Sequence, residues 1–255
     1  VYGVYGKGNE VGAFCGRLDG EGGDSKKVYA NIAVDISYTT IIGKGYTGGL
    51  VGRMNQINYF SLKSVNMTGL YVKGTINVGG LIGLANECKI ENQMFNGNIS
   101  GASSVSVTGT EDVGGFIGEY CCTSDTDFNM GDISVTASTF VIAGQNNVGG
   151  VIGHVVLGNA TLLGNTTLKL SYNSSITGTG DNVGTAFGEW ASGNLTDGIT
   201  ISLASGSAVS GLNRVGGAIG DWATGNLENG INVTLSNSAI VGGNYVAGAV
   251  GYWYG

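Results

Sequence analysis

Val113-Gly-Gly-Phe-Ile-Gly118 is one copy of a six-residue pattern that recurs along the whole chain. The other copies occupy residues 11–16, 47–52, 78–83, 148–153, 183–188, 215–220 and 246–251. Their first residues are separated by 36, 31, 35, 35, 35, 32 and 31 positions. Eight copies at near-constant spacing predict an array of stacked structural repeats.

Each interval between copies contains two further apolar segments. One alternates apolar and polar residues, as in Asp132-Ile-Ser-Val-Thr136, and this period of two predicts a strand with one buried face. The other is a short aliphatic run that ends in Gly, as in Ile142-Ala-Gly144. Nowhere do apolar residues recur at i, i+3 and i+4 for three turns, so helices should be scarce. We therefore predict an all-β protein, a parallel β-helix (β-solenoid) of about eight rungs with three short strands per coil of 31–36 residues, which forms one domain over residues 1–255.

The composition agrees with stacked coils. The chain has 49 Gly and no Pro, and 42% of its residues are hydrophobic. Gly permits positive φ at the corners, whereas Pro would remove a ladder donor from a coil. A net charge of −7 argues against a nucleic-acid partner or an anionic membrane surface. No run of 18 apolar residues occurs, so membrane insertion is not expected.

One coil carries a resemblance to a known family. Val78-Gly-Gly-Leu-Ile-Gly83, followed by Cys88-Lys-Ile-Glu-Asn92 and Gly97-Asn-Ile-Ser-Gly101, resembles the bacterial GLUG repeat. That repeat occurs in surface adhesins and in the non-catalytic N-terminal region of immunoglobulin A-cleaving metallopeptidases. The resemblance implies an extended, non-catalytic segment at the cell surface. Copies six to eight depart from it, because they have Ala where copies two to five have a larger residue after Gly-Gly.

Two columns of equivalent residues change size in opposite directions. The fourth motif position becomes Ala in the last three copies, and the residue four places later becomes Trp190, Trp222 and Trp253. Such compensation is expected of side chains that fill one close-packed layer. The alternative is an exposed Trp and Tyr ladder that stacks on sugars, such as a host or matrix glycan, or on another subunit.

A polar column lies next to the tryptophans. It comprises Arg17, Arg53, Leu84, Glu119, His154, Glu189, Asp221 and Tyr252. We expect a solvated surface, with a metal site or an acid–base pair at Glu119, His154 and Glu189 as the alternative. One His cannot supply a His-based zinc site, and the H-E-x-x-H pattern of metallopeptidases is missing. We predict no cofactor and no enzymatic activity.

Cysteines and sequons point to an extracellular location. Cys88 follows the third motif copy, and Cys121 and Cys122 follow the fourth. Adjacent rungs lie about 4.8 Å apart, so a disulfide between Cys88 and either neighbour is predicted, with Cys15 a free, buried thiol. Candidate N-glycosylation sites are Asn66, Asn98, Asn159, Asn165, Asn173, Asn194 and Asn232.

Both ends of the chain are apolar and aromatic. Tyr2 and Tyr5 lie at the start, and Tyr252, Trp253 and Tyr254 lie at the end. Uncapped β-edges pair readily with another chain. We therefore expect either end-to-end self-association, which builds a filament, or continuation in a longer chain.

The sequence as a whole predicts a non-enzymatic structural or adhesive rod of a surface fibre, filament or large adhesin. A glycan-binding module is the main alternative. A polysaccharide-degrading β-helix enzyme would need carboxylates clustered in one groove, whereas the 18 acidic residues look scattered. An ice-binding solenoid would need a flat Thr-x-Thr face, and the Thr residues do not align into one.

Overall fold

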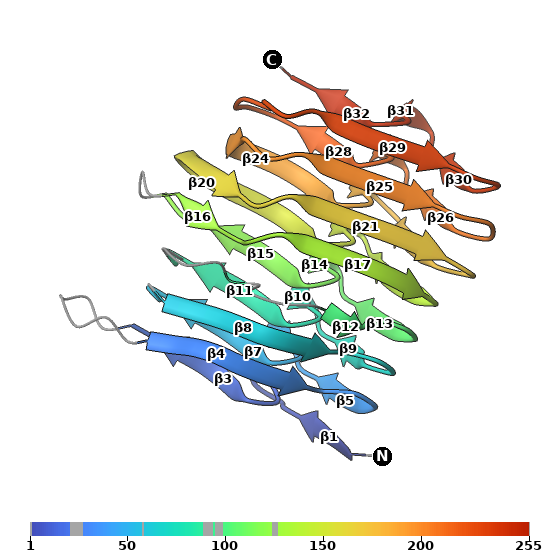
Figure 1. The fold of residues 1–255 in the computed structure, drawn as a ribbon. Coiled ribbons are helices and arrows are strands. Elements are labelled where there is room, and N and C mark those ends of the chain that lie inside the picture. The colour runs from blue at the N-terminus through green and yellow to red at the C-terminus, as the bar shows by residue number, and fades with distance from the viewer. Residues whose placement is uncertain are drawn as a thin grey trace.

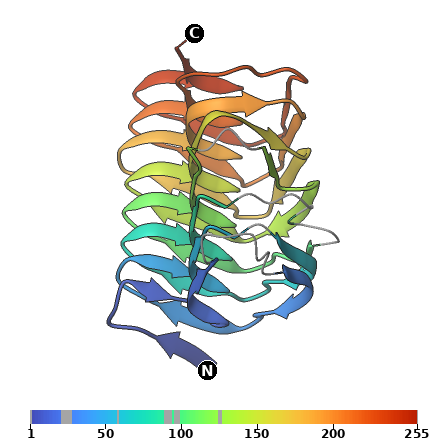
Figure 2. The ribbon, with the colours of Figure 1, turned by 90° about the vertical axis from the view of Figure 1, so that its left-hand side faces the viewer.

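The computed structural model describes residues 2–20, 28–57, 59–88, 94, 99–123 and 127–254, which form 32 β-strands and no helix. The chain winds through about seven turns of about 33 residues each. We number the coils by the motif copy that they contain. Figure 2 shows the coils stacked from the N-terminal to the C-terminal end. The predicted all-β solenoid is confirmed.

Three sheets of equivalent strands run along the solenoid. Sheet A contains β1 (Tyr2–Tyr5), β5 (Thr39–Ile42), β9 (Tyr71–Lys73), β13 (Val105–Thr108), β18 (Phe140–Gly144), β22 (Ser175–Gly178), β26 (Ala208–Ser210) and β30 (Ala239–Val241). Sheet B contains β2 (Glu10–Val11), β6 (Tyr46–Gly48), β10 (Ile76–Gly79), β14 (Glu111–Gly114), β19 (Asn146–Gly149), β23 (Asp181–Gly184), β27 (Asn213–Gly216) and β31 (Asn244–Ala247). Sheet C contains β3 (Cys15–Asp19), β7 (Val51–Asn55), β11 (Ile82–Asn86), β15 (Ile117–Cys121), β20 (Ile152–Leu163), β24 (Phe187–Leu195), β28 (Ile219–Trp222) and β32 (Val250–Trp253), and β16 (Phe128–Asn129) pairs with β20.

Two shorter sheets complete the wall opposite sheet C. Sheet D contains β4 (Val28–Asp35), β8 (Tyr59–Asn66) and β12 (Ile99–Gly101). Sheet E contains β17 (Ile133–Ser138), β21 (Thr166–Ser171), β25 (Ile199–Leu203) and β29 (Ile231–Leu235). In Figure 1 the strands of sheets D and E lie in front of sheet C.

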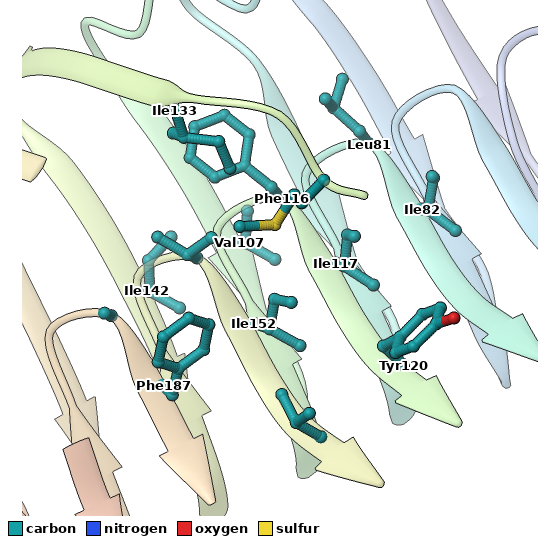
Figure 3. Packing of buried hydrophobic residues seen from close by; sticks show 14 of the residues in the cluster. Leu81, Ile82, Val107, Phe116, Ile117, Tyr120, Ile133, Ile142, Ile152 and Phe187 are labelled. Carbon is teal, nitrogen blue, oxygen red and sulfur yellow. The ribbon is translucent and has the colours of Figure 1, made fainter. Parts of the chain in front are cut away.

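The motif copies stack in register as parallel strands. Ile82 pairs with Val51 on one side and Ile117 on the other, which are its equivalents in the neighbouring coils. The core lies between the sheets. Val107 and Ile142 point into it from sheet A, Phe187 from sheet C and Ile133 from sheet E (Figure 3).

Each motif copy forms two strands rather than one, so a complete coil has four strands and the predicted three is wrong. In coil four the chain bends at Gly115 and Phe116, between β14 and β15. Beyond the bend, β15 approaches β10 of the preceding coil so closely that only Gly fits. A Cβ atom on Gly118 would lie 2.5 Å from the carbonyl carbon of Asn77 and from the amide nitrogen of Val78.

The third motif position allows a direct test of this packing. A methyl group on Gly217 would clash with the carbonyl oxygen of Gly248 in the next coil, whereas one on Gly248 would meet nothing within 4 Å. We expect Gly217→Ala to lower the free energy of unfolding by about 1–3 kcal/mol because the two coils must separate. Gly248→Ala is the matched control and should be close to neutral. Urea titrations of both variants measure the difference, and equal stabilities would contradict the packing described.

Candidate functional site: the corner strip

Two columns of polar side chains face each other along one corner of the solenoid, and we call them together the corner strip. The first column precedes each motif copy and comprises Glu10, Tyr46, Asn77, Asp112, Asn147, Asn182, Arg214 and Tyr245. The second follows each copy and comprises Arg17, Arg53, Leu84, Glu119, His154, Glu189, Asp221 and Tyr252. They meet because the motif folds back on itself. The guanidinium of Arg214 lies 2.9 Å from the Asp221 carboxylate, and the rings of Tyr245 and Tyr252 have centroids 5.0 Å apart.

The backbone of the first column has an unusual conformation. From Asn77 to Tyr245, the residue at this position has a φ between 53° and 63° in six successive coils. Asn and Asp tolerate this left-handed region better than most residues, and they occupy it in coils three to six. The corner therefore explains why short polar side chains line the strip there.

The centre of the strip is a cluster of three carboxylates around the single His of the chain. The Nδ1 atom of His154 lies 3.6 Å from Glu119 and 3.7 Å from Asp112, and its Nε2 atom lies 3.8 Å from Glu189. The predicted proximity of Glu119, His154 and Glu189 is confirmed. Asp112 was missed, because its place beside them depends on the fold-back of the motif. The expectation that the acidic residues are scattered is wrong at this point.

Burial and charge act in opposite directions on His154. Desolvation alone lowers its pKa, but Glu119, Asp112 and Glu189 together raise the pKa above its ordinary value. Burial also raises the pKa of Asp112 to about 6, against the opposing effects of the Asn147 hydrogen bond and of His154. The cluster therefore favours a bound proton.

Within the described ranges, no three His, Cys, Asp or Glu side chains are arranged to hold a metal ion. A shallow pocket of about 210 Å³ lies beside Lys44, Tyr46 and Ile76, and none of the cluster residues lines it. This pocket therefore provides no substrate cavity for an acid–base pair in the cluster.

Side-chain hydrogen bonds continue the strip from coil to coil. Asn147 donates to Asp112 at 2.8 Å, and Asn182 donates to Asn147 at 2.9 Å. A parallel ladder runs one residue earlier, where Asn213 donates to Asp181 at 2.8 Å and Asn244 donates to Asn213 at 2.7 Å. These contacts join successive coils along the axis.

The tryptophan column is part of the core in coils six and seven. Trp190 and Trp222 are fully buried, and their rings stack with centroids 4.8 Å apart at 8°. Each indole N–H donates to a backbone carbonyl, of Gly193 and Gly225 respectively. The core-filling interpretation is confirmed, and an exposed ladder is wrong for these two residues.

The remaining aromatic candidates lie at the ends of the described chain. Trp253, Tyr254 and Tyr5 are 53%, 68% and 64% exposed. Tyr252 is half-buried and contacts Tyr254 and Arg214. The side chain of Tyr2 lies outside the described part of the structure.

The close packing of the small residues opposite the tryptophans can be tested by substituting larger residues for them. Ala218 is fully buried beside the Trp222 layer, so Ala218→Phe should overpack it and lower the free energy of unfolding by about 1–3 kcal/mol. Ala249 occupies the same column in coil eight and is only half-buried, so Ala249→Phe is the control and should have a smaller effect. Thermal denaturation compares them, and an unchanged melting temperature for Ala218→Phe would contradict the buried layer.

The predicted disulfide is not present, because all four cysteines are free thiols. Asn86 pairs with Cys121 across the two coils, and continuing this register places Cys88 opposite Thr123 rather than opposite a cysteine. Burial raises the pKa of Cys88 to about 12 and that of Cys121 to about 11, which makes both thiols unreactive. Cys15 is a free thiol as predicted, but it is half-buried because β3 is an edge strand.

The sequons differ in accessibility. Asn159, Asn165, Asn173 and Asn232 are exposed, whereas Asn66 and Asn194 are half-buried. Asn98 lies outside the described residues.

The fold defines the chain as a tandem-repeat β-solenoid. Comparisons with protein-family models, with curated proteins and with solved structures found no match to the chain. The resemblance to the GLUG repeat therefore stays a prediction. Nowhere in the described part of the chain is there a candidate membrane-spanning helix.

Proposed function

We propose that this chain is a non-enzymatic structural or adhesive rod module of an extracellular fibre, filament or large surface protein. The observation that supports it best is the continuity of the ladder, since sheets A, B and C each run through eight parallel strands without interruption. The hydrogen bonds of such strands lie along the rod axis, so the rod resists bending and extension. The GLUG resemblance supports a cell-surface location.

The two ends of the described solenoid suit axial contacts. Strands β1, β2 and β3 form the edge of their sheets at one end, and β30, β31 and β32 do so at the other. Apolar side chains lie exposed beside both edges, including Phe14, which is 57% exposed, and Trp253. A further coil would cover them, either from a second copy or from more of the same polypeptide.

A charge placed inside the last coil tests end-to-end contact. Ala249→Lys introduces a cation into the inward column of coil eight, where the next coil would have to pack, and edge strands are protected in this way. We expect the unmodified chain to form filaments in negative-stain images, and Ala249→Lys to remain monomeric by light scattering. Val241→Lys is the matched control, because Val241 is exposed on the outer face and its column already contains Lys73. Two results together would contradict both end-to-end assembly and continuation in a longer chain. The unmodified chain would be monomeric, and the native protein would have the mass of 255 residues.

The accessibility of the sequons can be tested by secretion from a eukaryotic host. Asn173 and Asn232 are exposed, so both should carry glycans when the chain is secreted from a eukaryotic host. Asn165 should remain unmodified, because its amide donates to Asp132 and the middle residue of its sequon, Thr166, is buried. Peptide mapping after enzymatic deglycosylation reports the occupied sites. A glycan on Asn165 with none on the other two would contradict this order of accessibility.

Glycan binding is retained as a second candidate because of one surface feature. Tyr245, Tyr252 and Tyr254 form a chain of ring contacts with centroids 5.0 and 6.4 Å apart, beside the guanidinium of Arg214. Exposed aromatic faces with polar neighbours suit sugar stacking. Glycan-array binding that is lost in Tyr254→Ala would support this alternative.

The outer face of sheet E offers less support for ice binding. Hydroxyl side chains do align there, in the columns Ser134–Thr167–Thr200–Asn232 and Thr136–Lys169–Ser202–Thr234. No strand of sheet E carries Thr at both positions, and Lys169 interrupts one column.

A further inference from the structure

His154 connects three successive coils. It belongs to β20 in coil five, while Glu119 and Asp112 belong to β15 and β14 in coil four, and Glu189 belongs to β24 in coil six. Both ring nitrogens face carboxylates, at 3.6 to 3.8 Å. An imidazolium shares its positive charge between both nitrogens and attracts the carboxylates on both sides, whereas a neutral ring has no charge with which to attract them. Only the protonated ring can therefore serve coils four and six together.

The surrounding groups leave this role to His154 alone. The charged groups on the strands packed against it are the carboxylates of Asp112, Glu119 and Glu189, with Glu111 beside Asp112. The first-column neighbours Asn147 and Asn182 are neutral. Arg214, the nearest cation along the strip, is paired with Asp221 in coil seven at 2.9 Å. When His154 is neutral, the carboxylates of coils four and six face each other across coil five with no cation between them.

We propose that His154 is a proton-dependent bridge that holds coils four, five and six together in mild acid and loses this effect as the solution becomes alkaline. The bridge makes the rod a pH-responsive element. The inference concerns the rod's own stability and does not depend on what the rod assembles with or binds.

The direction of the pH effect follows from the geometry and from the pKa values. A group with a raised pKa in the folded protein stabilises it fully below the unfolded pKa, and this stabilisation is lost as the pH rises through the folded pKa. For His154 the loss begins near its ordinary pKa of 6.5 and continues above it. For Asp112 the loss occurs between its ordinary pKa of 3.8 and about 6. The His154 contribution is therefore measured above pH 6.5 as the difference between the unmodified chain and a variant that lacks this ring.

The experiment measures urea unfolding of the 255-residue chain from about pH 5 to about pH 9 for three proteins. They are the unmodified chain, His154→Asn, which is neutral at every pH, and Glu228→Gln, which removes a carboxylate outside the cluster. We expect the unmodified chain and Glu228→Gln to lose stability above pH 6.5, with the unfolding equilibrium constant rising about tenfold for each pKa unit by which folding raises the His154 value. His154→Asn should be less stable in acid and should lose less stability than the unmodified chain as the pH rises above 6.5.

A second measurement keeps the proposal testable if His154→Asn fails to fold. Because the chain has one His, its NMR titration reports the folded pKa directly. A value above 6.5 that falls in Glu189→Gln is expected. A value at or below 6.5, or a His154→Asn variant with the unmodified pH profile, would overturn the bridge. So would stabilisation by zinc at alkaline pH that His154→Asn abolishes, because the cluster would then be a metal site.

Discussion

Contact between backbones at the motif glycines is the constraint on which the rest of the structure depends. A Cβ atom on Gly118 would lie 2.5 Å from the backbone of coil three, and the equivalent Gly153 would meet coil four in the same way. Because these positions carry no side chain, sheet B of one coil can approach sheet C of the next, and the chain turns sharply at every copy. The corner strip is a direct product of this fold-back, since it brings the residues before and after each copy face to face.

Stacking in register places equivalent residues directly above one another along the axis. Such columns are stabilising for some side chains and destabilising for others. Amides gain from it, because Asn147 and Asn182 donate and accept in one ladder. Carboxylates at the rung spacing of about 4.8 Å repel one another by roughly 1 kcal/mol in water, and by more when half-buried. The second column places His154 between Glu119 and Glu189, and Arg214 lies against Asp221, so cations separate or neutralise the acids. The charge pattern of the strip therefore reduces the repulsion that stacking these coils would otherwise cause.

Sequence periodicity predicted the axial order of this protein well and its cross-section less well. Recurrence of the motif is sufficient to predict parallel strands in register. The sequence alone also reveals that the small side chain of Ala218 accompanies the large side chain of Trp222. Each motif breaks into two strands because of how closely two backbones can approach. The spacing of the copies in the sequence gives no information about that distance. Asp112 was missed for that reason. The disulfide prediction was wrong because the register places Cys121 opposite Asn86, and hence Cys122 opposite residue 87, so that Cys88 falls opposite Thr123.

The tryptophan column shows that core and surface are not fixed properties of a residue in a solenoid. Trp190 and Trp222 have the same motif position as Trp253 and are fully buried, whereas Trp253 is 53% exposed. The difference arises from stacking alone, because β24 and β28 have a neighbour on both sides and β32 pairs only with β28 in the described chain. One more coil would convert the aromatic end from the surface proposed to bind sugars into an ordinary core layer. Assembly and glycan binding at that end are therefore mutually exclusive uses of the same side chains.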